Sequence, residues 1–279
     1  MLWRDKTLGL KFENNGSIEN PCIKLTIFSP PKQLLTDQYR ESLTQEISWR
    51  FNFNQDISKF CSEYKKDEFL EAPIRHWKGM KPTASNSLYE MLVIYVVLQN
   101  ATVKRSVQML ENLFARFGEK VSFNGQTLSV FWSPNSLAKS TEKEIRALKV
   151  GYRAKSLLRI SQQFASGIVD EYSLRRMTKE NAGKELDKLY GIGPASIDGL
   201  LFELFYFVDA LEIIPPWEQK IMSRLLFERR MVPASKILRF FKERYGGYEK
   251  LAFHYLWEDL FWKRKSGEHI AWLEKEIRL

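Results

Sequence analysis

The stretch that decides the fold is KLYGIGPASIDG, Lys188 to Gly199. Gly191 and Gly193 flank Ile192, with apolar residues before them and a strongly apolar run after them. This pattern predicts a helix, a tight turn that needs glycine at positive φ, and a second helix, over about residues 178–207. Such a turn and the following helix N-terminus present backbone N–H groups that suit a phosphate. A close-packed corner between two helices is the alternative interpretation.

The charge balance favours an anionic partner. The chain of 279 residues has 43 Lys and Arg against 34 Asp and Glu, for a net charge of +9. Nucleic acid is the first expectation for such a chain and a membrane surface the second. The longest apolar runs, residues 91–98 and 200–208, are too short to cross a bilayer. We therefore expect a soluble intracellular monomer, in the nucleus or in the cytoplasm or nucleoid depending on its source.

Cysteine and histidine are scarce. Two cysteines, Cys22 and Cys61, exclude a four-cysteine zinc or iron–sulfur site built from this chain, and they favour a reducing compartment. The three histidines, His76, His254 and His269, show no metal-ligand spacing. We expect neither a catalytic metal nor a redox cofactor.

The residue patterns predict an α+β protein with an N-terminal antiparallel β domain over residues 1–56 and a helical domain over 57–279. A turn signal at residues 14–16 precedes CIKLTIF (22–28), where apolar residues alternate until Pro30 and Pro31. The same alternation in ISWRFNF (47–53) predicts another strand.

Helical signals dominate after that. Ser87 with Glu90, and Thr141 with Glu144, have the spacing of capping boxes that open helices. Residues 103–117 place apolar side chains on one helical stripe that Gly118 ends.

The order of several motifs resembles a known family. These motifs are LVIYVVLQNATVKRSVQMLENLFARFG (92–118), SPNSLAKSTEKEIRALKVGYRAKSLLRIS (133–161), the glycine turn at 191–193, and FFKERYGGYEKLAFHYLW (240–257). From about residue 47 to residue 260 the chain resembles the helix-hairpin-helix (HhH-GPD) DNA glycosylase superfamily. It is most similar to eukaryotic-type 8-oxoguanine and 3-methyladenine DNA glycosylases, which also carry an N-terminal antiparallel sheet.

The resemblance implies DNA contacts at two places. Gly191, Ile192, Gly193 and Ala195 would offer amides to a DNA phosphate, a contact that positions DNA without reading its sequence. A structural monovalent cation at this hairpin would fit the family.

Four further residues match those that act on the strand opposite the lesion. Asn100, Arg105 and Arg153 match the residues that read the orphan cytosine in 8-oxoguanine glycosylases. Asn100 would also fill the gap left by the flipped base, and Tyr152 matches an intercalating tyrosine. Solvated helix charge is the alternative for the two arginines.

The predicted base pocket departs from that of the 8-oxoguanine enzymes. Trp257 stands where an aromatic ring stacks on the flipped base, although core packing is an alternative for it. Phe253 replaces a glutamine that bonds the oxidised base, and the family's Gly-Gln-Ser-Phe stretch has no counterpart before residue 47. A pocket of this kind would recognise bases by stacking and shape, as alkylpurine enzymes do.

The catalytic positions also depart from the family pattern. The family aspartate lies two residues after a proline, so Pro216 places Glu218 there, whereas Pro215 would place Trp217 there and leave no acid. We prefer Glu218, whose charge would stabilise an oxocarbenium-like sugar, over an exposed helix-start glutamate. Arg224 then falls where 3-methyladenine enzymes often carry a basic residue. Ala195 replaces the lysine nucleophile of bifunctional members.

The sequence thus predicts a monofunctional base-excision DNA glycosylase that binds double-stranded DNA containing a damaged base. It would flip a damaged purine, with a modified guanine opposite cytosine as the expected lesion, and hydrolyse its N-glycosidic bond without strong lyase activity. The alternative is a catalytically impaired relative that binds damaged DNA.

Overall fold

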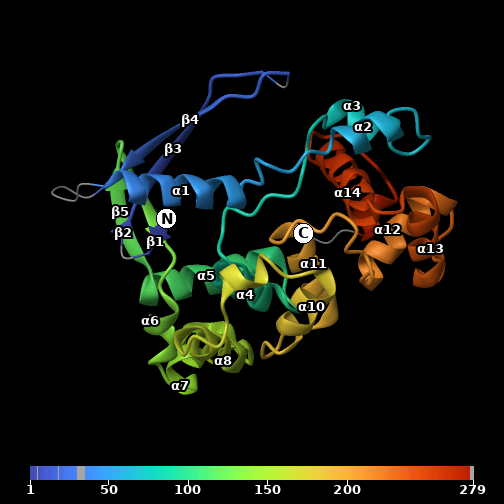
Figure 1. The fold of residues 1–279 in the computed structure, drawn as a ribbon. Coiled ribbons are helices and arrows are strands. Elements are labelled where there is room, and N and C mark those ends of the chain that lie inside the picture. The colour runs from blue at the N-terminus through green and yellow to red at the C-terminus, as the bar shows by residue number, and fades with distance from the viewer. Residues whose placement is uncertain (5, 18, 30–34, 277–279) are drawn as a thin grey trace. The chain divides into compact units, whose positions relative to one another are not determined.

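The computed structural model describes residues 1–4, 6–17, 19–29 and 35–276 (Figure 1). Backbone contacts group the chain into two compact units. The first unit comprises Met1–Arg50, Asn86–Tyr172 and Leu189–Gly191, and the second comprises Phe51–Ser85, Ser173–Lys188 and Ile192–Leu279. This grouping differs from a single cut at residue 56, because a large helical segment packs with the N-terminal residues.

The strands of the first unit form three antiparallel pairs. They are β1 (Leu2–Trp3) with β2 (Lys6–Thr7), β3 (Gly9–Asn14) with β4 (Ile23–Phe28), and β5 (Glu119–Phe123) with β6 (Gln126–Val130). The turn signal at residues 14–16 marks the end of β3, and the strand expected within residues 22–28 is β4, which pairs with β3 with Leu10 opposite Ile27. Pro30 and Pro31 lie outside the described residues.

A strand predicted over residues 47–53 is wrong. Helix α1 spans Asp37–Arg50, and residues 51–54 form a turn. The buried positions of α1 follow a helical period of three and four residues rather than an alternation, so four alternating apolar residues at its end were misleading. These buried residues are Tyr39, Leu43, Glu46, Ile47 and Arg50.

Both predicted capping boxes are present. Ser87 opens α4 (Leu88–Leu98), and Thr141 opens the short α7 (Glu142–Ile145), each with reciprocal bonds to the glutamate three residues on. Gly118 ends α5 (Val103–Phe117) as expected. The expected apolar stripe of α5 is only partly buried, since Val103 and Val107 are exposed.

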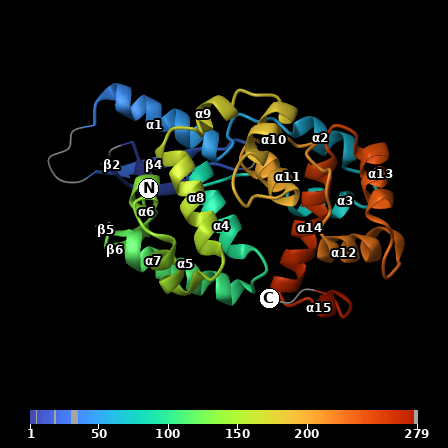
Figure 2. The ribbon, with the colours of Figure 1, turned by 90° about the horizontal axis from the view of Figure 1, so that it is seen from below.

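The remaining helices of the first unit complete its body. Helix α8 (Arg153–Ala165) packs against α4, beside which it lies in Figure 2, and against α6 (Pro134–Ala138). A π-helical turn, η1 (Arg146–Val150), leads into α8, and α9 (Glu171–Leu174) follows it.

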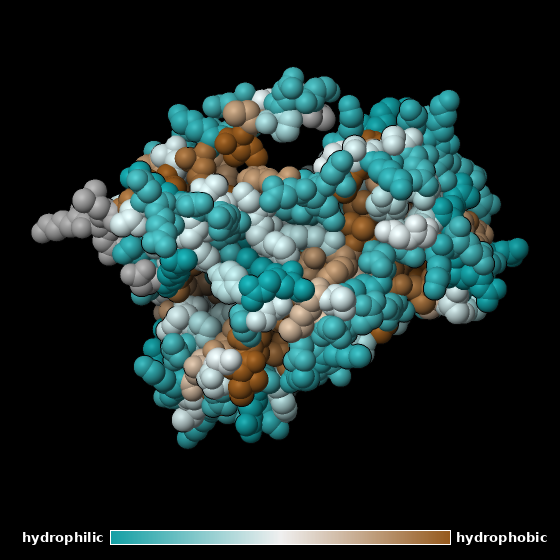
Figure 3. All heavy atoms as spheres, viewed as in Figure 1, coloured by the Kyte–Doolittle hydropathy of each residue, from teal (hydrophilic) through white to brown (hydrophobic). Residues whose placement is uncertain are grey.

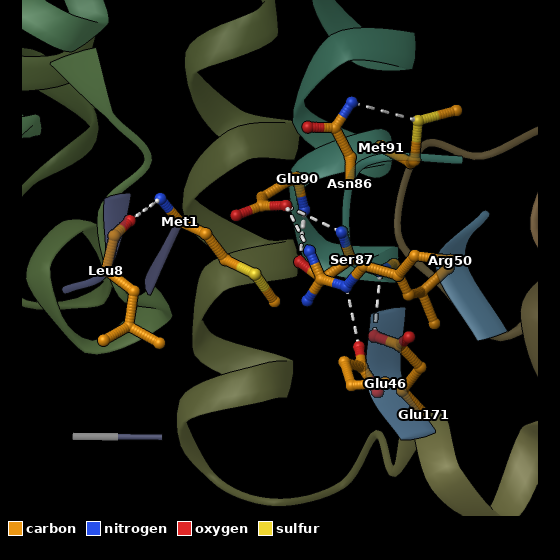
Figure 4. Close-up of polar contacts among 10 residues, drawn as sticks. Met1, Leu8, Glu46, Arg50, Asn86, Ser87, Glu90, Met91 and Glu171 are labelled. Carbon is orange, nitrogen blue, oxygen red and sulfur yellow. Dashed lines mark hydrogen bonds and ion pairs between the residues drawn. The ribbon is translucent and has the colours of Figure 1, made fainter. Parts of the chain in front are cut away.

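A buried ion cluster ties α1 to α4. Arg50 Nε lies 2.7 Å from Glu46 Oε1, and Arg50 Nη1 lies 3.6 Å from Glu90 Oε2 (Figure 4). Glu90 also accepts a 2.7 Å bond from the Ser87 amide, and Glu171 accepts one of 2.8 Å from Leu88. Glu90 therefore both caps α4 and belongs to the cluster of three buried charges.

The second unit is entirely helical in its described elements. These are α2 (Ser58–Tyr64), α3 (Glu71–His76), α10 (Lys179–Asp187), α11 (Pro194–Glu203), α12 (Pro216–Phe227), α13 (Ala234–Tyr245), α14 (Glu249–Lys265) and α15 (Leu273–Glu276). Helix α14 contacts α3 and α13, and α12 contacts α13 and α15. Its core is rich in aromatic rings, among which Phe60, Phe241, Tyr245 and Tyr255 are fully buried.

These elements confirm the expected α+β class and the expected helical hairpin, formed by α10 and α11. Hydrophilic residues predominate on the face shown in Figure 3. None of the described helices is long and apolar enough to cross a membrane.

Replacing Arg50 with methionine should destabilise the first unit strongly. The change removes the guanidinium that lies against the buried Glu46 and Glu90, and breaking a buried ion pair in this way typically costs about 3–5 kcal/mol. Urea denaturation measures the free energy of unfolding. The control is Lys11→Met, which removes a partner 2.9 Å from Glu13 that is 44% exposed and should cost less than about 1 kcal/mol. Equal losses in the two variants would contradict a structural role for the cluster.

Candidate DNA-binding and catalytic residues

The turn between α10 and α11 needs glycine at one position. Gly191 has φ +78°, and a Cβ there would lie 2.5 Å from Ser156 Oγ, closer than any side chain can approach. Gly193 is the N-cap residue of α11 and has no side chain with which to cap it. Pro194 at the first helical position has no N–H, so the Ala195 amide is the first donor of the helix. This is the geometry predicted for a phosphate site.

Side chains of the first unit contact Tyr190 and Gly191, the residues of the turn that belong to the same unit. Gln99 Nε2 donates a 2.8 Å bond to the Gly191 carbonyl, and the Tyr190 amide donates one of 3.3 Å to Gln163. The Lys155 ammonium lies 5.4 Å from the centre of the Tyr190 ring. The monovalent cation expected at this hairpin stays an expectation.

The four residues matched to the opposite strand gather in the first unit. Asn100 has φ +48° and donates through Nδ2 to the Tyr152 hydroxyl at 3.4 Å. That hydroxyl donates to the Gln99 carbonyl at 3.3 Å, and the Arg153 guanidinium donates to the same carbonyl. Arg105 donates to the Lys149 carbonyl at the end of η1.

Burial separates the two arginines. Arg153 is 7% exposed, its guanidinium lies 4.7 Å from the centre of the Tyr152 ring, and its Nε has no hydrogen-bond partner in the described part of the chain. Arg153 is therefore a fixed side chain and not a solvated helix charge. Arg105 is exposed, as is Tyr152, and their contacts with DNA stay predictions.

Glu218 lies in the first turn of α12, two residues after Pro216, and points into the second unit. Its Oε2 is buried, with no hydrogen-bond partner among the residues that the structure describes. Burial raises the pKa of Glu218; the charge of Lys250 opposes this, and that of Glu203 adds to it. A helix-start glutamate turned to solvent is therefore excluded. A buried carboxylate without a partner is costly, and such groups are typical of functional sites.

Trp217 and Trp257 form an aromatic pair beside Glu218. Trp217 is 45% exposed, and its indole meets that of Trp257 at 5.1 Å with an interplanar angle of 76°. Trp257 is half-buried, so part of its surface remains accessible. Phe253, one helical turn earlier, is 3% exposed and packs 5.4 Å from Phe241 in the core. A direct contact of Phe253 with a base stays a prediction.

Three residues near this site carry no sequence motif. Lys250 and His254 share one face of α14 with Trp257, and burial lowers the pKa of His254 to about 4, so its imidazole is neutral at pH 7. Asp198, in α11, is buried. The i, i+4, i+7 spacing on α14 could have indicated the first two, whereas no local pattern marks Asp198.

Residues 93–252 match the family model described as "HhH-GPD superfamily base excision DNA repair protein", and this is more than half of the chain. The chain belongs to this superfamily. The family resemblance that the order of its motifs predicted is confirmed.

Two curated HhH-GPD relatives are about equally distant. The "DNA-3-methyladenine glycosylase" of Bacillus subtilis is 25% identical over 175 residues, 62% of this chain but only 58% of that protein. The "Probable N-glycosylase/DNA lyase" of Methanothermobacter thermautotrophicus is 24% identical over 232 residues, 75% of this chain and 72% of that protein.

Solved structures show the same fold. The 3-methyladenine DNA glycosylase of Archaeoglobus fulgidus matches with a TM-score of 0.75 at 16% identity, covering 94% of this chain and 86% of that chain. The 8-oxoguanine glycosylase/lyase of Clostridium acetobutylicum, solved with double-stranded DNA containing cytosine opposite 8-oxoguanine, matches with a TM-score of 0.68 at 20% identity, covering 92% and 82%. The HhH-GPD fold is therefore shared with structures of both substrate classes.

Glu218→Gln should stabilise the protein at neutral pH. Because the pKa of Glu218 is raised in the folded state, its ionised form destabilises folding above that pKa, and protonation removes the penalty below the unfolded pKa. We expect a gain of about 1–3 kcal/mol at pH 7, which should disappear as the pH falls below 4. Urea denaturation across this pH range measures it. The exposed Glu243, changed to glutamine, should show no such gain; a Glu218→Gln variant without a gain would contradict the burial of the charge.

Proposed function

We propose that this HhH-GPD protein is a DNA glycosylase that removes a damaged purine by hydrolysis. The observation that carries the proposal is the buried, partnerless Oε2 of Glu218 beside the Trp217–Trp257 pair. A protein seldom tolerates such a carboxylate without a functional reason. Glycosidic bond cleavage needs a fixed negative charge, because the sugar becomes oxocarbenium-like as the base departs.

Glu218 would act in its ionised form. The departing base takes the electron pair of the N-glycosidic bond and a proton, and water adds its hydroxyl group to C1′ of the sugar. The carboxylate stabilises the cationic sugar and orients the water. Burial favours the protonated acid, and the charge of Lys250 opposes it. We infer that Lys250 helps to keep Glu218 ionised despite its burial.

Water rather than lysine would be the nucleophile. Ala195, whose methyl group cannot form a Schiff base, occupies the position of the family lysine. This supports a monofunctional enzyme, even though one relative is named as a lyase.

The substrate we propose is a modified guanine opposite cytosine. Trp257, which meets Trp217 edge-to-face, would stack on the flipped base, and an indole face favours a purine made cationic by alkylation. Tyr152 and Arg153 donate to the Gln99 carbonyl, and Asn100 donates to the Tyr152 hydroxyl, which would place their polar groups toward the orphaned base of the other strand.

Base release from a panel of duplexes tests the activity. Each duplex carries 8-oxoguanine, 7-methylguanine, 3-methyladenine, hypoxanthine or uracil opposite each normal base. We expect release of a modified guanine opposite cytosine, and Glu218→Gln should reduce its rate by about 100-fold or more, since it removes the charge that stabilises the transition state. Glu243→Gln is the matched control and should retain the wild-type rate.

Sodium borohydride added to the same reactions detects a Schiff base. We expect no trapped protein–DNA adduct with the active duplex; an adduct would contradict hydrolysis by water and identify a lysine nucleophile. If the Glu218→Gln variant releases the base at the wild-type rate, Glu218 is not the catalytic carboxylate.

Arg153→Ala should weaken discrimination of the opposite base. A bidentate contact with cytosine or its neighbourhood is worth about 1–3 kcal/mol, so the ratio of release rates opposite cytosine and opposite adenine should fall by about 5- to 150-fold. Arg159→Ala, which removes an exposed arginine from the same helix, should leave the ratio unchanged. The same loss in both variants would point to general phosphate binding instead.

A second function is favoured by one observation. If the position of the family's catalytic aspartate is counted from Pro215 instead of Pro216, Trp217 stands there and the site has no acidic residue. Such a protein would bind damaged DNA without cutting it. Lesion-dependent binding by wild type, with no base released from any duplex of the panel, would establish this alternative.

A further inference from the structure

The loop before the catalytic helix is tied to α11 through one carboxylate. Asp198 Oδ2 accepts a 2.8 Å bond from the Glu212 amide and a 2.7 Å bond from the Ile213 amide. Asp198 is 7% exposed, so its side chain is fixed in the body of the second unit. Residues 211–215 have no regular secondary structure of their own. The two hydrogen bonds therefore fix the conformation of a loop whose backbone forms neither helix nor strand.

The chain that follows is stiff. Ile213 precedes Ile214, Pro215 and Pro216, and each proline ring fixes φ and removes an N–H donor. Pro215 is the N-cap of α12 and Pro216 its first residue, with Glu218 two positions further on. A displacement of the loop at Ile213 would therefore displace Glu218 by a similar distance.

Other contacts hold a different part of the loop. Val208 O accepts the amides of Lys250 and Leu251 at 2.9 and 3.0 Å, and Lys179 Nζ lies 2.6 Å from Asp209 Oδ2. These contacts fix residues 208 and 209, at the far end from α12. Asp198 acts on the end that enters the catalytic helix.

We propose that Asp198 is a positioning residue that sets the place of Glu218 relative to the DNA phosphate held at the hairpin turn. Helix α11 carries both the Ala195 amide, in its first turn, and Asp198, in its second turn. The inference rests on the proposed glycosylase function and names the residue that would align its two parts. Positioning within about 1 Å matters, because a misplacement of that size can cost about 100-fold in rate.

A measurement can distinguish a positioning role of Asp198 from a purely structural one. Glu212 and Ile213 are exposed, so water can satisfy their amides when Asp198 is removed. We therefore expect the fold to survive while the loop loses its fixed geometry. The rate of the chemical step should fall, whereas the affinity for DNA should not, because the amides of the turn remain in place.

The experiment compares three variants under single-turnover conditions on the duplex that the wild type cleaves. Asp198→Ala should lower the base-release rate by about 100-fold with the dissociation constant for DNA unchanged within about twofold. Hydrogen exchange at the Glu212 and Ile213 amides should accelerate. Asp198→Asn keeps an oxygen acceptor of the same shape and should recover most of the rate. Asp209→Asn, the control, removes a carboxylate from the same loop and should behave as wild type.

Each other outcome has a defined meaning. An Asp198→Ala variant that retains the wild-type rate overturns the positioning role and leaves the glycosylase function intact. Equal losses in rate and DNA affinity overturn it as well, since they indicate general damage to the hairpin. A wild-type protein that releases no base overturns the proposed function first and this role with it. Hydrogen exchange reports the loop contact independently of activity.

Discussion

Gln99 makes the interaction on which the DNA-facing part of the first unit depends. Its side chain donates to the carbonyl of Gly191, the residue of the hairpin turn whose positive φ only glycine adopts readily. Its backbone carbonyl accepts from Tyr152 and from the buried Arg153. One residue at the end of α4 thus links the predicted phosphate site to the predicted opposite-strand site.

The second unit shows the complementary constraint, which is electrostatic. Burial of the Glu218 carboxylate disfavours its charged form and raises its pKa. The charge of Lys250 favours the charged form and so opposes this effect. A negative charge held in such a site would stabilise a positive charge that develops next to it.

The HhH-GPD fold leaves lesion choice to the side chains. Solved structures of 8-oxoguanine and 3-methyladenine enzymes resemble this chain to a similar degree, so the backbone does not separate the two classes. The predicted site residues of the two units are expected to resemble different substrate classes. Asn100, Arg105 and Arg153 are predicted to read the opposite base, whereas the Trp217–Trp257 pair would suit recognition of a base by stacking. This combination is the basis for the substrate proposed.

The sequence by itself determined the features that depend on near neighbours in the chain. The glycine turn, the capping boxes at Ser87 and Thr141, and the α+β class all follow from local spacing, and the structure confirms them. Local spacing also failed at residues 47–53, where a short alternation predicted a strand and the packing of α1 against α4 through Arg50 favoured helix. Only the tertiary structure decided that the Glu218 Oε2 and the Arg153 side chain are buried, and that Asp198 accepts hydrogen bonds from the loop before α12. Those properties arise from residues distant in the chain, whose proximity depends on how the helices pack and leaves no periodic signal in the sequence.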